Sequence, residues 1–252
     1  FRGHNDSVYT NVSWKNYSTF SLWDTYRTLN PLFTVIKPDM VGDMINSYLG
    51  IYDQQGKLPI WPLVGGETEC MPGYSAIPVI ADAYLKGLSG FDAERAMNAM
   101  LVSSTYPKQK GVPYVMEQGY IPCDKLHEAT SVAMEYAVGD WGIAQMAKKM
   151  GKDSVYNEYL KRGKYYTQYF DKDINYIRPK NSAGKWTAPY DPFLSVHGTG
   201  DFCEGTGWQY TFFVPQHPEG LIELFGGDEP FISKLDSLFV AEGDMGEGYS
   251  AD

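Results

Sequence analysis

The chain has 252 residues and a formal net charge of -10, which argues against nucleic acid and anionic membrane surfaces as partners. No apolar run approaches the roughly 20 residues that a membrane-spanning helix needs. The 3 cysteines are far apart and odd in number, so we expect neither a disulfide framework nor a structural zinc site.

Residues 1–37 are rich in Asn, Ser, Thr and aromatic side chains, which predicts an irregular entry segment. Helical spacing of apolar residues begins at Pro38, in a helix that ends at Gly50, and a turn-rich linker follows over residues 54–66. Further helices are predicted over residues 74–85, 92–101, 131–150, 153–169, 205–214, 218–225 and 230–239. Glycines close many of these helices, as is common at helix ends.

A short β-hairpin is predicted in the second half of the chain. The strand Tyr176-Ile177-Arg178 is separated from Trp186 by the turn signal at residues 181–184. Successive amphipathic helices of this kind pack as bundles, solenoids or a closed α/α toroid. No short internal repeat is visible, which argues against a solenoid. We therefore predict a mainly α fold.

The densest group of chemically useful residues lies at residues 197–209 and reads H-G-T-G-D-F-C-E-G-T-G-W-Q. Glu204 stands between Phe202 and Trp208 in a glycine-rich approach to a helix. Flanking aromatic rings can desolvate a carboxyl and raise its pKa, as a general acid requires. A helix N-terminus acts in the opposite direction, since it stabilises the charged carboxylate. On residues alone, a general acid and an ordinary first-turn helix acid both remain open.

Two further patches of the sequence carry acidic side chains. Asp24 and Arg27 lie among aromatic residues and could hold sugar hydroxyls, or they could pair with each other to fix a loop. Glu67, Glu69 and Cys70 come before the helix at residues 74–85 and could line a pocket or contact a hard cation. Solvated acids at a helix start are the alternative for this second patch.

Four segments together resemble glycoside hydrolase family 92. They are Ser21–Leu32 (S-L-W-D-T-Y-R-T-L-N-P-L), Glu67–Ala83 (E-T-E-C-M-P-G-Y-S-A-I-P-V-I-A-D-A), Ser131–Trp141 (S-V-A-M-E-Y-A-V-G-D-W) and Glu204–Pro215 (E-G-T-G-W-Q-Y-T-F-F-V-P). Their order and spacing match the family across nearly the whole chain. The resemblance implies bacterial, mostly secreted or periplasmic, exo-acting α-mannosidases that require calcium and invert the anomeric centre. It also implies an N-terminal β-sandwich joined to a six-hairpin α/α barrel.

Carried onto this sequence, the resemblance makes residues 38–252 part of the α/α-barrel catalytic region and Glu204 its general acid. It places Asp24 in contact with mannose and Cys70 with its neighbours at the rim of the same pocket. The expected substrate-binding residues are Asp24, Trp23, Arg27, Glu67, Cys70 and Trp208. Gln209 is the expected contributor to the calcium site.

The resemblance also implies that parts of the active site lie outside this chain. An inverting hydrolase needs a second carboxylate about 6.5–9.5 Å from the acid to activate water. In the family this base is an Asp pair downstream of a Glu-Pro-Ser-His-His segment, and neither occurs before Asp252. The β-sandwich and a signal peptide are also not in the sequence. The chain by itself can therefore lack activity, and two alternatives stay open: a sugar-binding or structural fragment, and an α/α-toroid glycosidase of other specificity.

Overall fold

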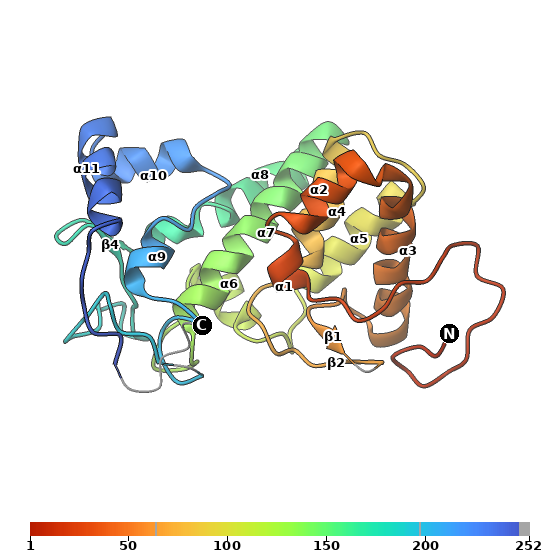
Figure 1. Cartoon of the computed structure of the whole chain (residues 1–252), viewed down its shortest axis with the longest axis horizontal. Coiled ribbons are helices and arrows are strands. Elements are labelled where there is room, and N and C mark those ends of the chain that lie inside the picture. Colours follow the sequence, from red (N-terminus) through yellow and green to blue (C-terminus); the bar gives the residue numbers. More distant parts are fainter. Residues whose placement is uncertain (64, 197, 247–252) are drawn as a thin grey trace. The chain divides into compact units, whose positions relative to one another are not determined.

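The computed structural model describes residues 1–63, 65–196 and 198–246 (Figure 1). Helices dominate these residues, with two small antiparallel strand pairs beside them, so the prediction of a mainly α fold is confirmed. The chain divides into two compact units. The first joins Phe1–Val112 to Gly139–Arg162, and the second joins Pro113–Val138 to the chain from Gly163 onward. Within the described ranges, no helix combines the length and apolar character needed to cross a membrane.

The first unit is built around three helices, α3, α4 and α5. Its elements are α1 (Leu22–Thr25), α2 (Leu29–Ile36), α3 (Pro38–Gln55), β1 (Pro62–Leu63), β2 (Gly66–Glu67), α4 (Ala76–Leu85), α5 (Ala93–Ser104), the second half of α7 (Ala129–Lys149) and α8 (Asp153–Arg162). Pro38 opens α3, as predicted, but the predicted end at Gly50 is wrong, because the helix continues to Gln55. Gly56 ends it in the left-handed conformation that favours glycine, with a φ of 81°. Asp92 caps α5 by accepting a hydrogen bond from the Arg95 N–H at 3.0 Å.

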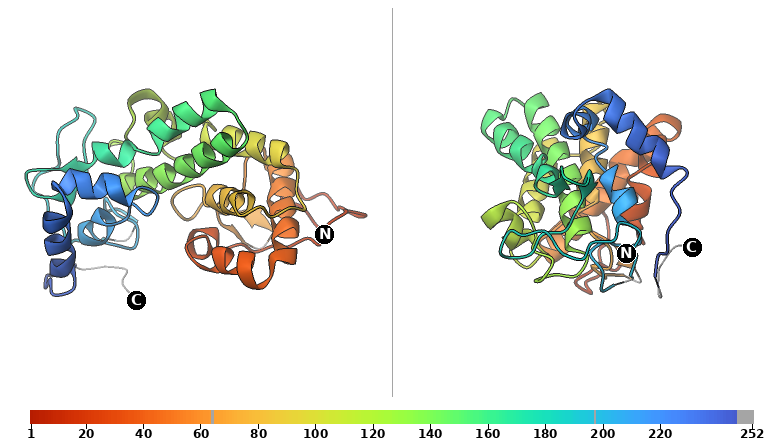
Figure 2. Two further views of the ribbon diagram at one scale, coloured as in Figure 1. Left: turned by 90° about the horizontal axis from the view of Figure 1, so that it is seen from above. Right: turned by 90° about the vertical axis from the view of Figure 1, so that its left-hand side faces the viewer.

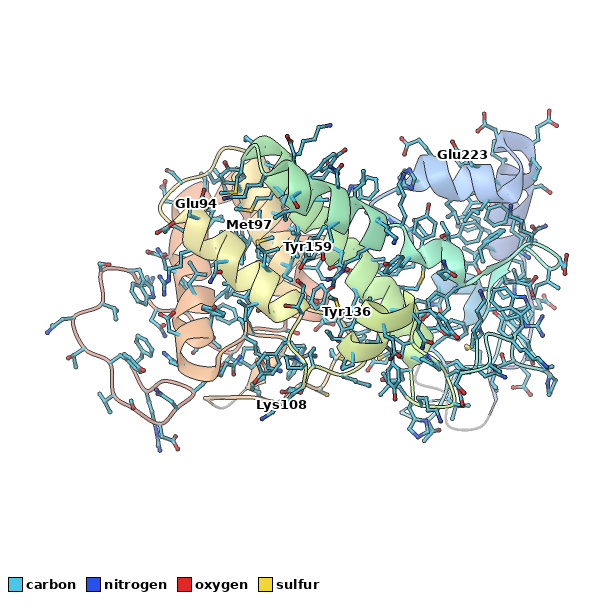
Figure 3. All side chains as sticks on the ribbon, turned by 180° about the vertical axis from the view of Figure 1, so that it is seen from behind. Glu94, Met97, Lys108, Tyr136, Tyr159 and Glu223 are labelled. Carbon is cyan, nitrogen blue, oxygen red and sulfur yellow. The ribbon has the colours of Figure 1, made fainter. Side chains whose placement is uncertain are left out.

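The core of the first unit lies where α3, α4 and α5 pack together. Its fully buried apolar side chains include Ile45, Tyr48, Leu49, Ile77, Ile80 and Met97. Tyr159 of α8 joins this core (Figure 3). Its hydroxyl lies 2.7 Å from the Ser104 hydroxyl at the end of α5. The apolar spacing read from the sequence therefore identifies the buried faces of these helices.

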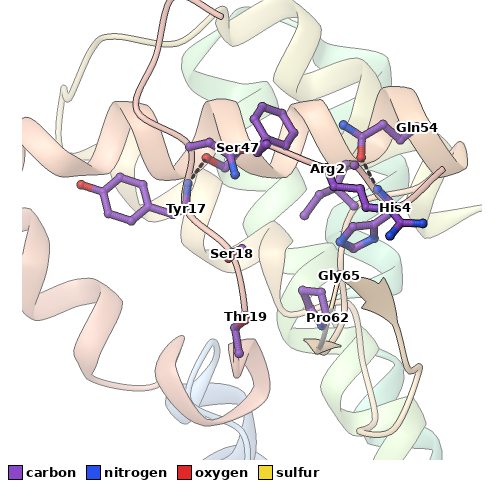
Figure 4. Close-up of a pocket in the computed structure, with 13 residues that line it drawn as sticks. Arg2, His4, Tyr17, Ser18, Thr19, Ser47, Gln54, Pro62 and Gly65 are labelled. Atoms are coloured by element: carbon purple, nitrogen blue, oxygen red, sulfur yellow. Dashed lines mark hydrogen bonds between the residues drawn. The ribbon is translucent and has the colours of Figure 1, made fainter. Parts of the chain in front are cut away.

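The N-terminal segment lies along α3 and leads to α1 (Figure 4). The His4 N–H donates to Gln54 Oε1 at 2.8 Å, and the Tyr17 N–H donates to the Ser47 hydroxyl at 3.0 Å. A cavity of about 30 Å³ between segment and helix has room for a water molecule. These bonds fix the approach of the chain to Asp24.

Helix α2 overturns part of the expected irregular entry segment of residues 1–37. Leu32, Val35 and Ile36 supply helical spacing, and Pro31 is the third residue of the helix. A proline is tolerated there because the first N–H groups of a helix have no intrahelical acceptor. The prediction of irregular structure is wrong for Leu22–Thr25, which forms α1, and for Leu29–Ile36, whereas the domain boundary at residue 37 stays a prediction.

The second unit combines short helices with a strand pair. Its elements are most of α6 (Val112–Gln118), the first half of α7, the 3₁₀ helix η1 (Tyr165–Gln168), β3 (Phe170–Asp171), β4 (Tyr176–Ile177), α9 (Gly207–Thr211), α10 (Pro218–Phe225) and α11 (Asp228–Leu238). Figure 2 shows α10 and α11 side by side, as their contacts require. Phe225 of α10 lies edge-on to Phe231 of α11 at 5.6 Å and to Phe170 of β3 at 4.9 Å between ring centroids.

The strand pairing differs from the prediction. β4 pairs with β3 and not with Trp186, which forms a single bridge to Lys180 across the predicted turn. Arg178 explains the choice, because its N–H donates to the Tyr169 carbonyl at 2.7 Å and its guanidinium pairs with Asp171 at 2.8 Å. The helix expected over residues 153–169 also ends early, at Arg162, before a glycine and the 3₁₀ turn. Helix α6 and the β1–β2 pair were not predicted.

The environment of His217 leads us to expect that the stability of the fold depends on pH. Its Nδ1 lies 2.9 Å from the Tyr166 hydroxyl, and burial, with the Lys164 charge, lowers the pKa of His217. The unfolded chain then binds this proton more readily than the folded one, so stability is lost as pH falls below about 6.5. We expect a lower Tm at pH 5 than at pH 7.5, and His217→Gln should weaken that difference. The matched variant His4→Gln should keep it, and an unchanged pH dependence in His217→Gln would contradict this account.

Candidate active site

Glu204 projects from a strained turn immediately before α9. Its side chain is exposed, and no hydrogen bond to its carboxylate occurs among residues 1–63, 65–196 and 198–246. Its φ of 43° lies in the left-handed region, which costs a non-glycine residue on the order of 1 kcal/mol. Such a conformation persists only where the surrounding structure holds it. His197, the first residue of the predicted cluster, lies outside the described residues.

The residue before Glu204 is held through both its N–H and its carbonyl oxygen. The Cys203 N–H donates to the Ser131 hydroxyl of α7 at 2.8 Å, and the Cys203 carbonyl accepts from the Tyr210 hydroxyl at 3.0 Å. The ring of Tyr210 also stacks on Phe202 at 5.3 Å. These contacts place the Glu204 turn on α7 and α9 and leave the carboxylate facing solvent.

A capping box holds the other side of the turn. Gln209 Oε1 accepts from the Thr206 N–H at 2.8 Å, while the Gln209 N–H donates to the Thr206 hydroxyl at 3.4 Å. The polar sequence after Glu204 thus starts α9 and limits the movement of the turn. Gln209 itself remains exposed.

Gly207 permits a close approach that no other residue allows. An added Cβ would lie 2.0 Å from the Tyr190 hydroxyl, which donates to the Ile177 carbonyl at 2.8 Å, and 3.2 Å from Cα of Pro192. Gly207→Ala should therefore lower the free energy of unfolding by about 1–3 kcal/mol, as overpacking does. Thermal denaturation should show a Tm lower by several degrees. Gly66→Ala, which meets no atom within 4 Å, is the control, and equal Tm values for both variants would contradict the prediction.

Trp208 lies in the wall of a cavity beside Gln209. The side chain is 9% exposed, its ring meets Tyr176 edge-on at 5.0 Å, and the Lys234 ammonium lies 4.3 Å above it. Its buried indole N–H has no hydrogen-bond acceptor among the residues that the structure describes. The cavity measures about 210 Å³, and its lining is Phe193, Thr206, Trp208, Gln209, Leu238, Ala241, Gly243 and Met245.

Cys123 and Asp201 are two further titratable groups of the second unit, and Asp201 lies three residues before Glu204. Burial, followed by the Asp201 charge, raises the pKa of Cys123 to about 11, so this thiol stays protonated and is no nucleophile at neutral pH. Burial also raises the pKa of Asp201, against the opposing effect of His127. Asp201 therefore retains its proton more readily than a solvated aspartate.

Asp24 lies in the first unit, on α1, and is exposed. Its carboxylate accepts hydrogen bonds from the Ser21 hydroxyl and, at 3.3 Å, from the indole N–H of Trp61. Asp24 is therefore not tied to Arg27, the pairing that the sequence left open. The guanidinium of Arg27 lies 5.0 Å from the Trp23 ring and donates to the Tyr26 hydroxyl at 3.1 Å.

Glu67 organises the second acidic patch of the first unit. Its carboxylate accepts three backbone hydrogen bonds, from Ile60 at 2.7 Å, Trp61 at 2.9 Å and Glu69 at 3.0 Å. Glu67 thus fixes the loop from which Cys70 is exposed. A substrate contact by Glu67 would have to share an already bonded carboxylate.

Trp61 and Lys57 were missed by the sequence analysis. Lys57 is buried, and its ammonium reaches Glu69 at 2.5 Å and Gln109 at 2.8 Å. Both lie in the stretch that was predicted to be a turn-rich linker. In the sequence, Trp61 stands out only because it precedes a proline, and Lys57 only because it is a single lysine in this stretch. Neither signal has a spacing that points to a partner, because the partners lie elsewhere in the chain.

Comparison with known proteins identifies the family. Residues 1–251 match the glycosyl hydrolase family 92 catalytic domain. The chain belongs to glycoside hydrolase family 92. A family GH92 α-mannosidase of Bacteroides thetaiotaomicron, solved in complex with mannoimidazole, is 39% identical, with a TM-score of 0.93 over 97% of this chain and 33% of that one. A GH92 inverting mannosidase of the same organism is 33% identical, with a TM-score of 0.83 over 92% of this chain and 32% of that one.

A curated relative of this family 92 chain is an uncharacterised secreted glycosidase of Arthroderma benhamiae. The two are 26% identical over 251 residues, which is 84% of this chain and 32% of the relative. The chain thus spans about a third of the length of the relatives it matches. The predicted site residues fall into two sets, Trp23, Asp24, Arg27, Glu67 and Cys70 in the first unit and Glu204, Trp208 and Gln209 in the second.

Calcium binding by this family 92 chain stays a prediction. Calcium takes roughly six to eight oxygen ligands. No group of three or more acidic, histidine or cysteine side chains is arranged to hold a metal in the described parts of the chain. The Gln209 carboxamide oxygen already accepts from the Thr206 N–H, which leaves it one free lone pair. It could serve as one ligand, and the others would have to come from elsewhere.

Proposed function

We propose that this chain carries the general acid and part of the sugar-binding pocket of an exo-acting, inverting α-mannosidase that cleaves mannans or N-glycans. The observation that carries the proposal is the exposed Glu204 carboxyl, held in a left-handed turn by contacts on both sides. Similarity to two GH92 mannosidases along nearly the whole chain supports the choice of mannose.

The proposed reaction is a single displacement. Protonated Glu204 donates its proton to the glycosidic oxygen as the bond from that oxygen to the anomeric carbon breaks. A water molecule attacks the anomeric carbon from the opposite face and yields a β-sugar, and its proton passes to a second carboxylate. That base is to be supplied by the longer protein. Asp24 and Arg27 are proposed to hold sugar hydroxyls through charge-assisted hydrogen bonds.

The proposal further includes a calcium ion, a location outside the cytoplasm and protein segments beyond this chain. Gln209 is proposed as one calcium ligand, with the rest from outside the described residues. The name of the secreted fungal relative supports a secreted or periplasmic location. Because the chain spans about a third of its relatives, we also propose that a β-sandwich and the rest of the barrel complete the site in the longer protein.

Proton NMR of the full-length protein with an α-mannobioside tests the proposal. We expect β-mannose to appear before mutarotation, and we expect a chelator to abolish its release until calcium is restored. Release of α-mannose first would refute inversion, and full activity in chelator would refute the calcium requirement. If mannosides stay intact while α-glucosides are cleaved, the substrate assignment fails.

A further inference from the structure

Lys234 of α11 places its ammonium on two aromatic rings. Its Nζ lies 3.4 Å from the ring centroid of Tyr176 and 4.3 Å from that of Trp208. The two rings meet edge-to-face at 5.0 Å, so the ammonium occupies the corner between them. Distances of this kind give strong cation–π attraction, especially where water is partly excluded.

Within the described residues, the two aromatic rings are the only groups that stabilise the Lys234 ammonium. Lys234 forms no salt bridge and no hydrogen bond there, whereas Lys57 reaches both Glu69 and Gln109. Burial alone lowers the pKa of Lys234, to about 8. A partly desolvated ammonium without an anion is costly, so its position depends on the aromatic faces.

Trp208 connects Lys234 to the turn that presents the acid. The indole belongs to the second residue of α9, whose backbone N–H donates to the Pro192 carbonyl at 3.2 Å. The same helix begins with the capping box of Thr206, two residues after Glu204. A tilt of the indole would therefore turn the first residues of α9 and move the Glu204 carboxyl with them.

We propose that Lys234 is a positioning residue, whose ammonium on Tyr176 and Trp208 fixes α9 and thereby aims the Glu204 carboxyl. The inference rests on the proposed role of Glu204 as general acid. Lys234 contributes through Trp208 and does not itself donate the proton. Its location on α11, in a segment with no buried residue, explains why no sequence signal marks it.

Two variants in the full-length protein test the inference. Lys234→Met keeps the unbranched stem and removes the charge, whereas Lys234→Arg keeps a cation on the rings. We expect Lys234→Met to lower kcat about 10-fold on an alkyl α-mannoside with KM within about 2-fold, and Lys234→Arg to stay within about 3-fold of wild type. Lys180→Met is the control, because Lys180 also lies on a tryptophan, 4.3 Å from the Trp186 ring. It should leave kcat unchanged.

The leaving group separates acid positioning from a general structural defect. A dinitrophenyl α-mannoside needs little protonation, so the loss in Lys234→Met should shrink to within about 3-fold on it. An equal loss on both substrates, or an equal loss in Lys234→Arg and Lys234→Met, would overturn the positioning role. Wild-type kcat in Lys234→Met would also overturn it. Full activity of Glu204→Gln would instead refute the proposed function, whatever the Lys234 variants do.

Discussion

Glu204→Gln in the full-length protein is expected to lower kcat/KM on an alkyl α-mannoside about 1,000-fold. Loss of general acid catalysis costs on the order of 10²–10⁴ when the leaving alkoxide must be protonated. The amide keeps the size and the exposed position of the side chain, so the turn should be preserved. On a dinitrophenyl α-mannoside, whose leaving group departs without a proton, the loss should be far smaller.

The matched control is Glu219→Gln. Glu219 is also exposed, lies in the first turn of α10 and belongs to the same unit. It should retain wild-type kinetics on both substrates. If Glu204→Gln stays within a fewfold of wild type on the alkyl mannoside, or if both substrates slow equally, Glu204 is not the general acid.

The largest stability effect is expected from Asp140→Ala. The Asp140 carboxylate, 1% exposed, accepts from the Tyr74 hydroxyl at 2.5 Å and pairs with Arg162 through bonds of 2.8 and 3.1 Å. The same guanidinium donates to the Ser104 carbonyl at 3.0 Å. Removing the carboxylate takes away two hydrogen bonds to the buried Arg162 guanidinium and the acceptor of the Tyr74 hydroxyl, and breaking a buried pair in this way costs about 3–5 kcal/mol.

Denaturant unfolding at neutral pH measures this loss as a lower midpoint with an unchanged slope. The comparison is Asp53→Ala, which removes an exposed partner of Arg95 in the same unit and should cost less than about 1 kcal/mol. If Asp140→Ala were no worse than Asp53→Ala, the buried pair would not hold the first unit together.

Local spacing predicted most of the helices, because their periodicity and end signals lie within a few residues. Pro218–Phe225 is predicted at both ends, since Pro218 starts α10 and Gly226 stops it in the left-handed conformation. The predicted strand partner of Tyr176 was wrong because strand pairing depends on contacts that local spacing does not contain. Strand pairing was decided by Arg178 and its bond to Asp171, which no turn signal encodes.

The sequence identified the candidate site residues but did not predict the contacts that position them. The glycine-rich segment and the family resemblance singled out Glu204, but its left-handed backbone depends on Ser131, 72 positions before Cys203. Asp24 was found as well, whereas its partner Trp61 was not, because the two are 37 positions apart. Contacts at such separations arise only once the helices have packed.

Because Glu204 has a φ of 43°, selection for stability and selection for activity should favour different residues at this position. Glycine adopts this backbone without steric cost, so a library of variants sorted for heat resistance alone should drift toward glycine at position 204. A library sorted for turnover should keep glutamate. Attempts to make the protein more resistant to heat should therefore leave position 204 fixed.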